Sequence, residues 1–287
     1  MIAPILQTAA DRVAVIGGGR QLSYRELDDR ARGLAAHWLG SELKPCDRVA
    51  LWMRNSPEVL VAYLACWKAG LIAVPIDLRY QPQQTRFILN NSEARAIVVD
   101  AEKQGDFAAS DGLPHLNQVI VANGPATLPG AVAFDDLTTP PVSEPRWPSF
   151  LGDQLSTIFY TSGTTSRPKG VVHSGQRTHR RVAKMVRECR LGPDTVSLVC
   201  LSLMRPLAFQ TQALAVLPVG GRVVTLPRFS AEAFWQTYNE SPAKTLLAFT
   251  PDMLAAILNH PAAKSADYTR LDLCIAGADS VPPALHT

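Results

Sequence analysis

Hydrophobic positions in the first half of the chain follow two different spacings. Apolar residues recur every three or four positions from Leu27 to Trp38, after a Ser23 and Glu26 pair that matches a capping box, and this predicts an amphipathic helix. A second helix is predicted from Ser56 to Gly70, and a third begins near Pro82. Short apolar runs between the helices predict strands at Asp47 to Met53, Leu71 to Pro75 and Ala96 to Val99.

The second half continues this alternation after a proline-rich, weakly periodic stretch between Gly124 and Pro148. Helices are predicted from about Gln176, Ala231 and Pro251, and strands at Leu155 to Tyr160, near Val171, and at Val196 to Leu201, Val223 to Leu226, Thr245 to Phe249 and Leu271 to Ala276. Alternating strands and helices are typical of parallel sheets covered on both faces. We therefore expect an α/β fold of two lobes, residues 1–150 and 151–287, connected by the proline-rich stretch, with mixed, mostly parallel sheets covered by helices.

Composition excludes several classes of protein. The chain has 287 residues with 28 Lys and Arg against 25 Asp and Glu, and this small excess gives no footprint for nucleic acid. The longest apolar run, Val59 to Trp67, is too short to span a membrane. The five cysteines form no C-x-x-C pair, and no basic region precedes an apolar block at the start. We therefore expect reduced thiols, no zinc site and a cytoplasmic location.

The segment from Phe159 to Val172 carries the most informative chemistry. It places five short hydroxyl side chains, a glycine and a lysine between two apolar runs, a combination that suits a polyphosphate. A plain polar turn is the alternative, but Pro168 stiffens the approach to the cation of Lys169. The segment is not a Walker A loop, because that motif has glycine before the lysine and Ser or Thr after it.

Two other glycine-rich or basic stretches have simpler interpretations. The glycines at 17–19 do not form a dinucleotide fingerprint, because Leu22 occupies the third glycine position, and a hairpin turn is the better interpretation. His173 is interpreted as structural, because no nucleophile accompanies it. An amphipathic helix presents a solvated basic face, or else a surface for the phosphates of coenzyme A or for an acidic carrier protein, formed by Arg177, Arg180, Arg181, Lys184, Arg187 and Arg190.

The segment from Tyr160 to Val171 resembles the signature loop of adenylate-forming enzymes, the superfamily of acyl-CoA synthetases, nonribosomal-peptide adenylation domains and luciferases. The stretch Ala276 to Pro282 resembles the adenine-binding strand and turn of that superfamily. The resemblance covers nearly the whole chain. Further agreement, in order and spacing, is found at Leu22 to Leu27, Asp47 to Ala50, Asn55 to Glu58, Tyr63 to Gly70 and Val74 to Asp77.

The resemblance implies a reaction and assigns residues to it. ATP, with Mg²⁺, would activate a carboxylic acid to an acyl-adenylate, and the acyl group would pass to the thiol of coenzyme A or of an acyl carrier protein. Catalysis would rest on positioning and electrostatic stabilisation, with Lys169 and Thr161 as catalytic residues. No residue is assigned to a metal. The nucleotide would be bound by Thr161, Ser162, Gly163, Thr164, Thr165 and Lys169, with Gly277 and Ala278 against the adenine.

The resemblance also marks a substrate pocket, formed by Arg205, Phe209, Phe249 and Ala276. Arg205 stands where the family commonly has histidine. If it faces the pocket, it favours an acid with a second carboxylate or another polar group. If it turns outward, it carries no information about the substrate.

The family continues beyond Thr287 with an acidic magnesium motif, a ribose-binding aspartate and a lid domain. We therefore expect this chain to be the N-terminal portion of such an enzyme, with no more than trace turnover alone. The alternatives are a truncated, non-catalytic nucleotide- or acyl-binding relative and a fragment of a peptide-synthetase adenylation domain. The sequence predicts nothing about the oligomeric state.

Overall fold

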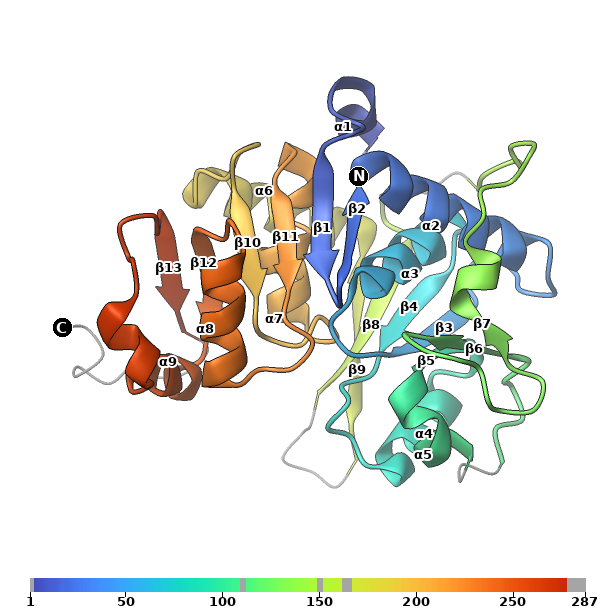
Figure 1. Cartoon of the computed structure of the whole chain (residues 1–287). Helices are drawn as coiled ribbons and strands as arrows, with labels where there is room; N and C mark the ends of the chain where they lie inside the picture. Colours follow the sequence, from blue (N-terminus) through green and yellow to red (C-terminus); the bar gives the residue numbers. More distant parts are fainter. Residues whose placement is uncertain (1–2, 109–111, 149–151, 162–166, 278–287) are drawn as a thin grey trace. The chain divides into compact units, whose positions relative to one another are not determined.

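The structure is a computed structural model of the chain, and it describes residues 3–108, 112–148, 152–161 and 167–277. The chain forms two compact units (Figure 1). The first unit contains residues 1–25, 55–57 and 180–287, and the second contains residues 26–54 and 58–179. Each unit is built around its own β-sheet.

The first unit has a six-stranded sheet in the order β13-β12-β10-β11-β1-β2. Its strands are β1 (Val13–Gly17), β2 (Arg20–Ser23), β10 (Val196–Val199), β11 (Arg222–Thr225), β12 (Thr245–Phe249) and β13 (Leu273–Ala276). The described strand pairs are parallel except β1 with β2, which is an antiparallel hairpin. Gly18 and Gly19 have φ values of 58° and 74° in its turn, a conformation that glycine adopts without steric cost. The predicted hairpin is therefore confirmed.

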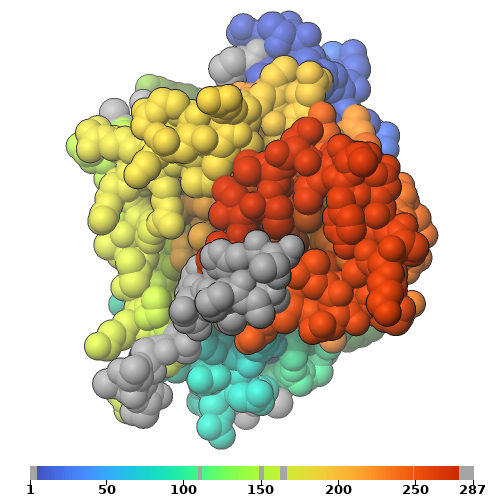
Figure 2. Space-filling model, turned by 90° about the vertical axis from the view of Figure 1, so that its left-hand side faces the viewer, coloured from blue at the N-terminus to red at the C-terminus, as the bar shows by residue number. Residues whose placement is uncertain are grey.

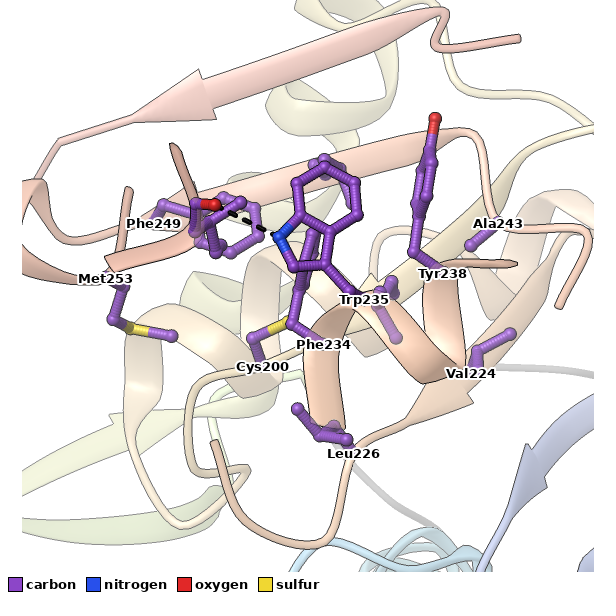
Figure 3. Close-up of a cluster of buried hydrophobic side chains, with 12 residues drawn as sticks. Cys200, Val224, Leu226, Phe234, Trp235, Tyr238, Ala243, Phe249 and Met253 are labelled. Carbon is purple, nitrogen blue, oxygen red and sulfur yellow. Dashed lines mark hydrogen bonds between the residues drawn. The ribbon is translucent and has the colours of Figure 1, made fainter. Parts of the chain in front are cut away.

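The helices of this unit include α1 (Ala3–Thr8), α7 (Pro206–Ala208), α8 (Ala231–Glu240) and α9 (Pro251–Leu258). A π-helical turn, η3 (Phe209–Ala213), follows α7, and 3₁₀ turns lie at η4 (Leu217–Val219) and η5 (Pro261–Ser265). Aromatic residues of α8 pack with strand and α9 residues into a core cluster, where Trp235 Nε1 donates to the Ile257 carbonyl over 3.0 Å (Figure 3). This bond satisfies the indole N–H inside an otherwise apolar cluster.

The second unit has a seven-stranded sheet in the order β7-β6-β5-β3-β4-β8-β9. Only β8 and β9 pair in antiparallel orientation among its described strands. Parallel neighbours need a crossover connection, and α3 (Pro57–Lys68) supplies the one between β3 and β4. The strands are β3 (Arg48–Trp52), β4 (Ile72–Pro75), β5 (Ala94–Asp100), β6 (Gln118–Ala122), β7 (Val132–Ala133), β8 (Leu155–Thr161) and β9 (Lys169–Ser174).

The second unit buries its sheet against helices α2 (Tyr24–Leu39), α3, α4 (Pro82–Asn91) and α5 (Gln104–Ala108), with 3₁₀ turns η1 (Ala101–Lys103) and η2 (Phe134–Leu137). Ile88 and Leu89 of α4 join strand residues in one core cluster. Lys68 of α3 pairs with Asp28 of α2 at 2.8 Å. Helix α6 (Gly175–Glu188) follows β9 and leads from the second unit into the first.

The expected α/β fold of mostly parallel sheets with helices is confirmed, but the two units do not follow the expected division at residue 150. The β1-β2 hairpin joins β11, and the β8-β9 hairpin joins β4. Both hairpins therefore add to sheets built mainly from the other half of the chain. The proline-rich stretch lies within the second unit rather than between the two.

Candidate functional site

The β8-β9 hairpin brings two of the predicted site residues together. Thr161 ends β8, Lys169 begins β9, and the two are paired in the ladder. Thr161 Oγ1 donates to the Lys169 carbonyl over 3.5 Å, and both residues are exposed. A hydroxyl and a cation thus lie at the same end of the hairpin, while Ser162, Gly163, Thr164 and Thr165 lie outside the described residues.

Gly170 follows Lys169 at a position where a side chain would crowd two neighbours. A Cβ atom at Gly170 would lie 3.0 Å from Ile158 Cγ2 and 3.2 Å from Tyr160 Cζ. Both distances are tighter than ordinary van der Waals contacts. Glycine next to Lys169 therefore lets the Tyr160 ring approach the backbone of β9.

Three further predicted residues meet at the carboxyl ends of β12 and β13 in the first unit. Phe249 and Ala276 are paired in the ladder, and the Gly277 N–H donates to the Phe249 carbonyl over 2.7 Å. A Cβ atom at Gly277 would meet no described atom within 4 Å. The described part of the chain thus leaves open space beside Gly277, whereas Ala278 lies outside the described residues.

The predicted pocket residues have different surroundings. Phe249 is 1% exposed and packs edge-to-face with Phe234, with 5.9 Å between ring centroids, so its ring belongs to the core cluster of Figure 3. Phe209 is equally buried on the π-helical turn, and its N–H donates to the Arg205 carbonyl over 3.0 Å. Arg205 itself is exposed at the start of α7. Packing against Phe234 therefore explains why the Phe249 ring is buried.

Sequence reasoning did not assign a role to Asn55, which holds the segment before Arg205. Asn55 is 4% exposed, and its Nδ2 donates to the carbonyls of Leu201 and Leu226 over 2.9 and 3.1 Å. Its Oδ1 accepts from the Leu203 N–H over 2.7 Å. The only sequence signal was its position in the Asn55 to Glu58 stretch that resembles the family.

The basic helix predicted from about residue 176 is α6. Its five Lys and Arg positions are all exposed, as is Arg190 beyond the end of the helix, and the side of the molecule drawn in yellow in Figure 2 includes this stretch. Val182 on the opposite side of the helix is 5% exposed. His173 lies before the helix, where its ring packs edge-to-face on Phe159 at 5.2 Å. This ring contact is consistent with a structural role for His173.

Metal ligands, membrane-spanning helices and reactive thiols are the other features that could define a site. No three His, Cys, Asp or Glu side chains in those ranges are grouped so that they could hold a metal ion. None of the described helices has the length and apolar character that crossing a bilayer requires. The five cysteines are free thiols, and burial raises the pKa of Cys66 and of Cys200 well above the ordinary value. Those two thiols stay protonated at neutral pH.

The sheets, the hairpin and the match to known sequences together define the class of this protein. A sequence profile described as AMP-binding enzyme matches residues 5–287, and the chain belongs to that family. The chain is 30% identical over 271 residues to the sulfoacetate–CoA ligase of Cupriavidus necator, covering 93% of this chain and 51% of the relative. It is also 30% identical over 262 residues to the mitochondrial malonate–CoA ligase of Mus musculus, covering 87% and 43%.

Solved structures show the same fold. The anthranilate CoA ligase AuaEII in complex with anthranoyl-AMP matches with a TM-score of 0.92 at 22% identity, over 99% of this chain and 55% of that one. ATP-bound MatB from Rhodopseudomonas palustris matches with a TM-score of 0.84 at 23% identity, over 99% and 55%. The chain spans about half the length of the curated relatives it matches.

Proposed function

We propose that this chain is part of an AMP-forming acid:thiol ligase, which activates a carboxylic acid with ATP to an acyl-adenylate and transfers the acyl group to coenzyme A. The observation that carries the proposal is the AMP-binding family match over residues 5–287. Relatives named as CoA ligases support coenzyme A as the acceptor. ATP supplies the leaving pyrophosphate, and the residues of this chain bind and orient the ATP.

The proposed contacts with the triphosphate come from Thr161, Ser162, Gly163, Thr164, Thr165 and Lys169. The exposed hydroxyl of Thr161 and the exposed ammonium of Lys169, at one end of the hairpin, support this assignment. Charge-assisted hydrogen bonds to phosphate are among the strongest that a protein makes. Gly277 and Ala278 are proposed to lie against the adenine, and the open space beside Gly277 supports that role.

Mg²⁺ is proposed only as a companion of the ATP phosphates. The described residues offer no cluster of three ligating side chains, so they do not form a protein cage for the ion. Mg²⁺ commonly binds through substrate phosphates and waters with one or two carboxylates. No residue of this chain is assigned to it.

The substrate is proposed to be an acid with a second polar or anionic group. Arg205 is proposed to face the acid pocket, where a guanidinium, which always carries charge, binds carboxylates in bidentate geometry. Sulfoacetate and malonate, the acids in the names of two relatives, both have a second acidic group. Phe209, Phe249 and Ala276 are proposed as the neighbouring pocket residues.

Two alternatives have specific support. Medium- and long-chain fatty acids appear in the name of a 27% identical ligase of Mycobacterium tuberculosis, which places a role in fatty acid metabolism among the alternatives. Surfactin synthase subunit 2 of Bacillus subtilis is 29% identical over 281 residues, so transfer to a carrier-protein thiol is the second alternative.

A cytoplasmic location is proposed from the free cysteines.

ATP binding and acid-dependent exchange of pyrophosphate with ATP test the proposal. We expect ATP to bind the wild-type chain in calorimetry and Lys169→Ala to weaken that binding by about 10- to 100-fold. Lys44→Ala is the matched control, because Lys44 is also an exposed lysine of the second unit. Absence of ATP binding, or equal affinity in both variants, would contradict the phosphate assignment.

A further inference from the structure

The end of the β8-β9 hairpin is held by side chains of α4 and of the turn before that helix. We propose that Tyr80, Phe87 and Asn91 are positioning residues that hold Tyr160 and Arg167, and thereby keep Thr161 and Lys169 in place. The inference rests on the proposed function. It adds residues that do not touch the nucleotide but decide where the residues that bind it lie.

Tyr160 is held at two points. Its carbonyl accepts a hydrogen bond from Tyr80 Oη over 3.2 Å, and its own Oη donates to Asn91 Oδ1 over 2.6 Å. Burial raises the pKa of both tyrosines, so each hydroxyl keeps its proton at neutral pH and can donate. The backbone and the ring of the residue before Thr161 are thus both tied to the same neighbouring segment.

The turn that carries Tyr80 is held by hydrogen bonds to Asp77. Both carboxylate oxygens of Asp77, which is 8% exposed, accept from the Arg79 guanidinium at 3.0 Å. Asp77 Oδ1 also accepts from the Arg79 backbone N–H over 3.1 Å, and the Tyr80 N–H donates to the Asp77 carbonyl over 3.0 Å. Bidentate pairs of this kind fix geometry as well as adding energy. The Tyr80 ring therefore leaves the turn from a well-defined backbone.

The segment that leads into β9 also contacts α4, through Arg167. The Arg167 guanidinium lies 5.9 Å from the centroid of the Phe87 ring, within the range of a cation–π contact. Phe87 and Asn91 are four residues apart on α4, so they share one face of the helix. Tyr80, Phe87 and Tyr160 also pack against one core cluster of the second unit. A single helix face therefore contacts the residues on both sides of the Thr161 and Lys169 pair.

This arrangement matters because phosphate chemistry depends on position. Small misplacements of a binding group can reduce rate and affinity far more than the lost contact itself suggests. The ladder and the hydrogen bond from the Thr161 hydroxyl to the Lys169 carbonyl hold these two residues relative to each other. The α4 contacts hold that pair relative to the body of the unit.

The test compares Tyr80→Phe and Phe87→Leu with two matched controls. Tyr268→Phe also removes one hydroxyl that donates to a carbonyl, that of Ala263 at 2.9 Å, and Phe107→Leu truncates another half-buried phenylalanine packed on the same cluster. Hydrogen exchange of the backbone amides in Lys169 to Val172 is the first readout. We expect exchange there to be roughly 2- to 10-fold faster in the two test variants and unchanged in the controls.

ATP affinity in calorimetry is the second readout, and we expect a roughly 3- to 10-fold loss in the test variants only. Asn91→Asp keeps an acceptor oxygen for Tyr160, and Phe87→Tyr keeps a ring face for Arg167, so both should behave as wild type. Exchange rates in the test variants equal to those of the controls would overturn the positioning role. A wild-type chain that binds no ATP would overturn the proposed function instead, while the exchange readout would still decide whether α4 holds the end of the hairpin.

Discussion

The two units hold the carboxyl-terminal ends of two strands, β10 and β8, by different kinds of contact. In the first unit, the segment after β10 is held by the buried amide of Asn55, which makes three hydrogen bonds to backbone groups. In the second unit, the end of β8 is held by half-buried or exposed side chains around Tyr160. Loss of a buried partner leaves groups that water cannot reach, whereas loss of a partly exposed partner lets water replace it. We therefore expect loss of a contact at the first segment to lower the free energy of unfolding strongly, and loss of a contact at the second to lower it less.

The largest expected effect is that of Asn55→Leu. The leucine side chain cannot bond to the Leu201 and Leu226 carbonyls or to the Leu203 N–H, and each buried group left unpaired costs about 1–3 kcal/mol. The free energy of unfolding should fall by about 3 kcal/mol or more in urea titrations. Asn117→Leu, at an exposed position, is the control. A loss below about 1 kcal/mol would remove the contrast between the two segments.

Asn55→Asp sharpens the same prediction. The aspartate keeps the shape of the side chain but places an oxygen where Nδ2 donated to two carbonyls. Repulsion should destabilise the chain at neutral pH, and protonation of the carboxyl should recover part of the stability in acid. If the destabilisation of Asn55→Asp relative to wild type is the same at neutral and at acid pH, the Asn55 Nδ2 donor does not hold the segment.

Alanine substitution of two glycines should change the free energy of unfolding by smaller amounts and in opposite directions, and this tests the packing of the β8-β9 hairpin. Gly170→Ala places a Cβ atom 3.0 Å from Ile158 Cγ2 and 3.2 Å from Tyr160 Cζ, so we expect a loss of about 1–2 kcal/mol. Gly105→Ala, in α5, would meet nothing within 4 Å and should gain about 0.4–1 kcal/mol through a less flexible unfolded chain. Thermal and urea unfolding of the two variants measure both. A stabilised Gly170→Ala would show that Tyr160 is not confined as the structure has it.

The sequence predicted local features well because they depend on neighbours in the chain. The expected strand from Leu155 to Tyr160 differs from β8 by one residue, and the hairpin turn at residues 17–19 follows from glycine alone. The hydrogen bonds of Asn55 and Tyr80 join residues far apart in the chain. Asn55 donates to a carbonyl 146 residues away, and Tyr80 donates to one 80 residues away. A single sequence contains no signal for such pairs. The expected division at residue 150 differs from the units for the same reason.

Gly277→Ala separates packing from ligand binding in the first unit. The added methyl group would meet no described atom within 4 Å, so the free energy of unfolding should stay within about 0.5 kcal/mol of wild type. If adenine lies against Gly277, as proposed, the methyl group should weaken ATP binding by roughly 5-fold in calorimetry. Unchanged affinity would remove Gly277 from the adenine contacts. A large loss of stability would instead show that the open space is filled in the folded chain.

The smallest expected effect is a pH dependence at His37, another half-buried contact of the second unit. Burial lowers the pKa of His37, and its hydrogen bond with Gln118 opposes that shift only in part. The folded chain therefore favours the neutral ring, and the unfolded chain binds the proton more readily. The resulting stability is present above the ordinary histidine pKa of about 6.5 and is lost as the pH falls below it. His37→Gln should flatten the fall in unfolding free energy between about pH 7.5 and 5.5 by less than about 1 kcal/mol, whereas His179→Gln, at an exposed position, should leave the slope unchanged. A slope that is the same in all three proteins would show that this contact, unlike the buried amide of Asn55, does not distinguish the folded chain from the unfolded one.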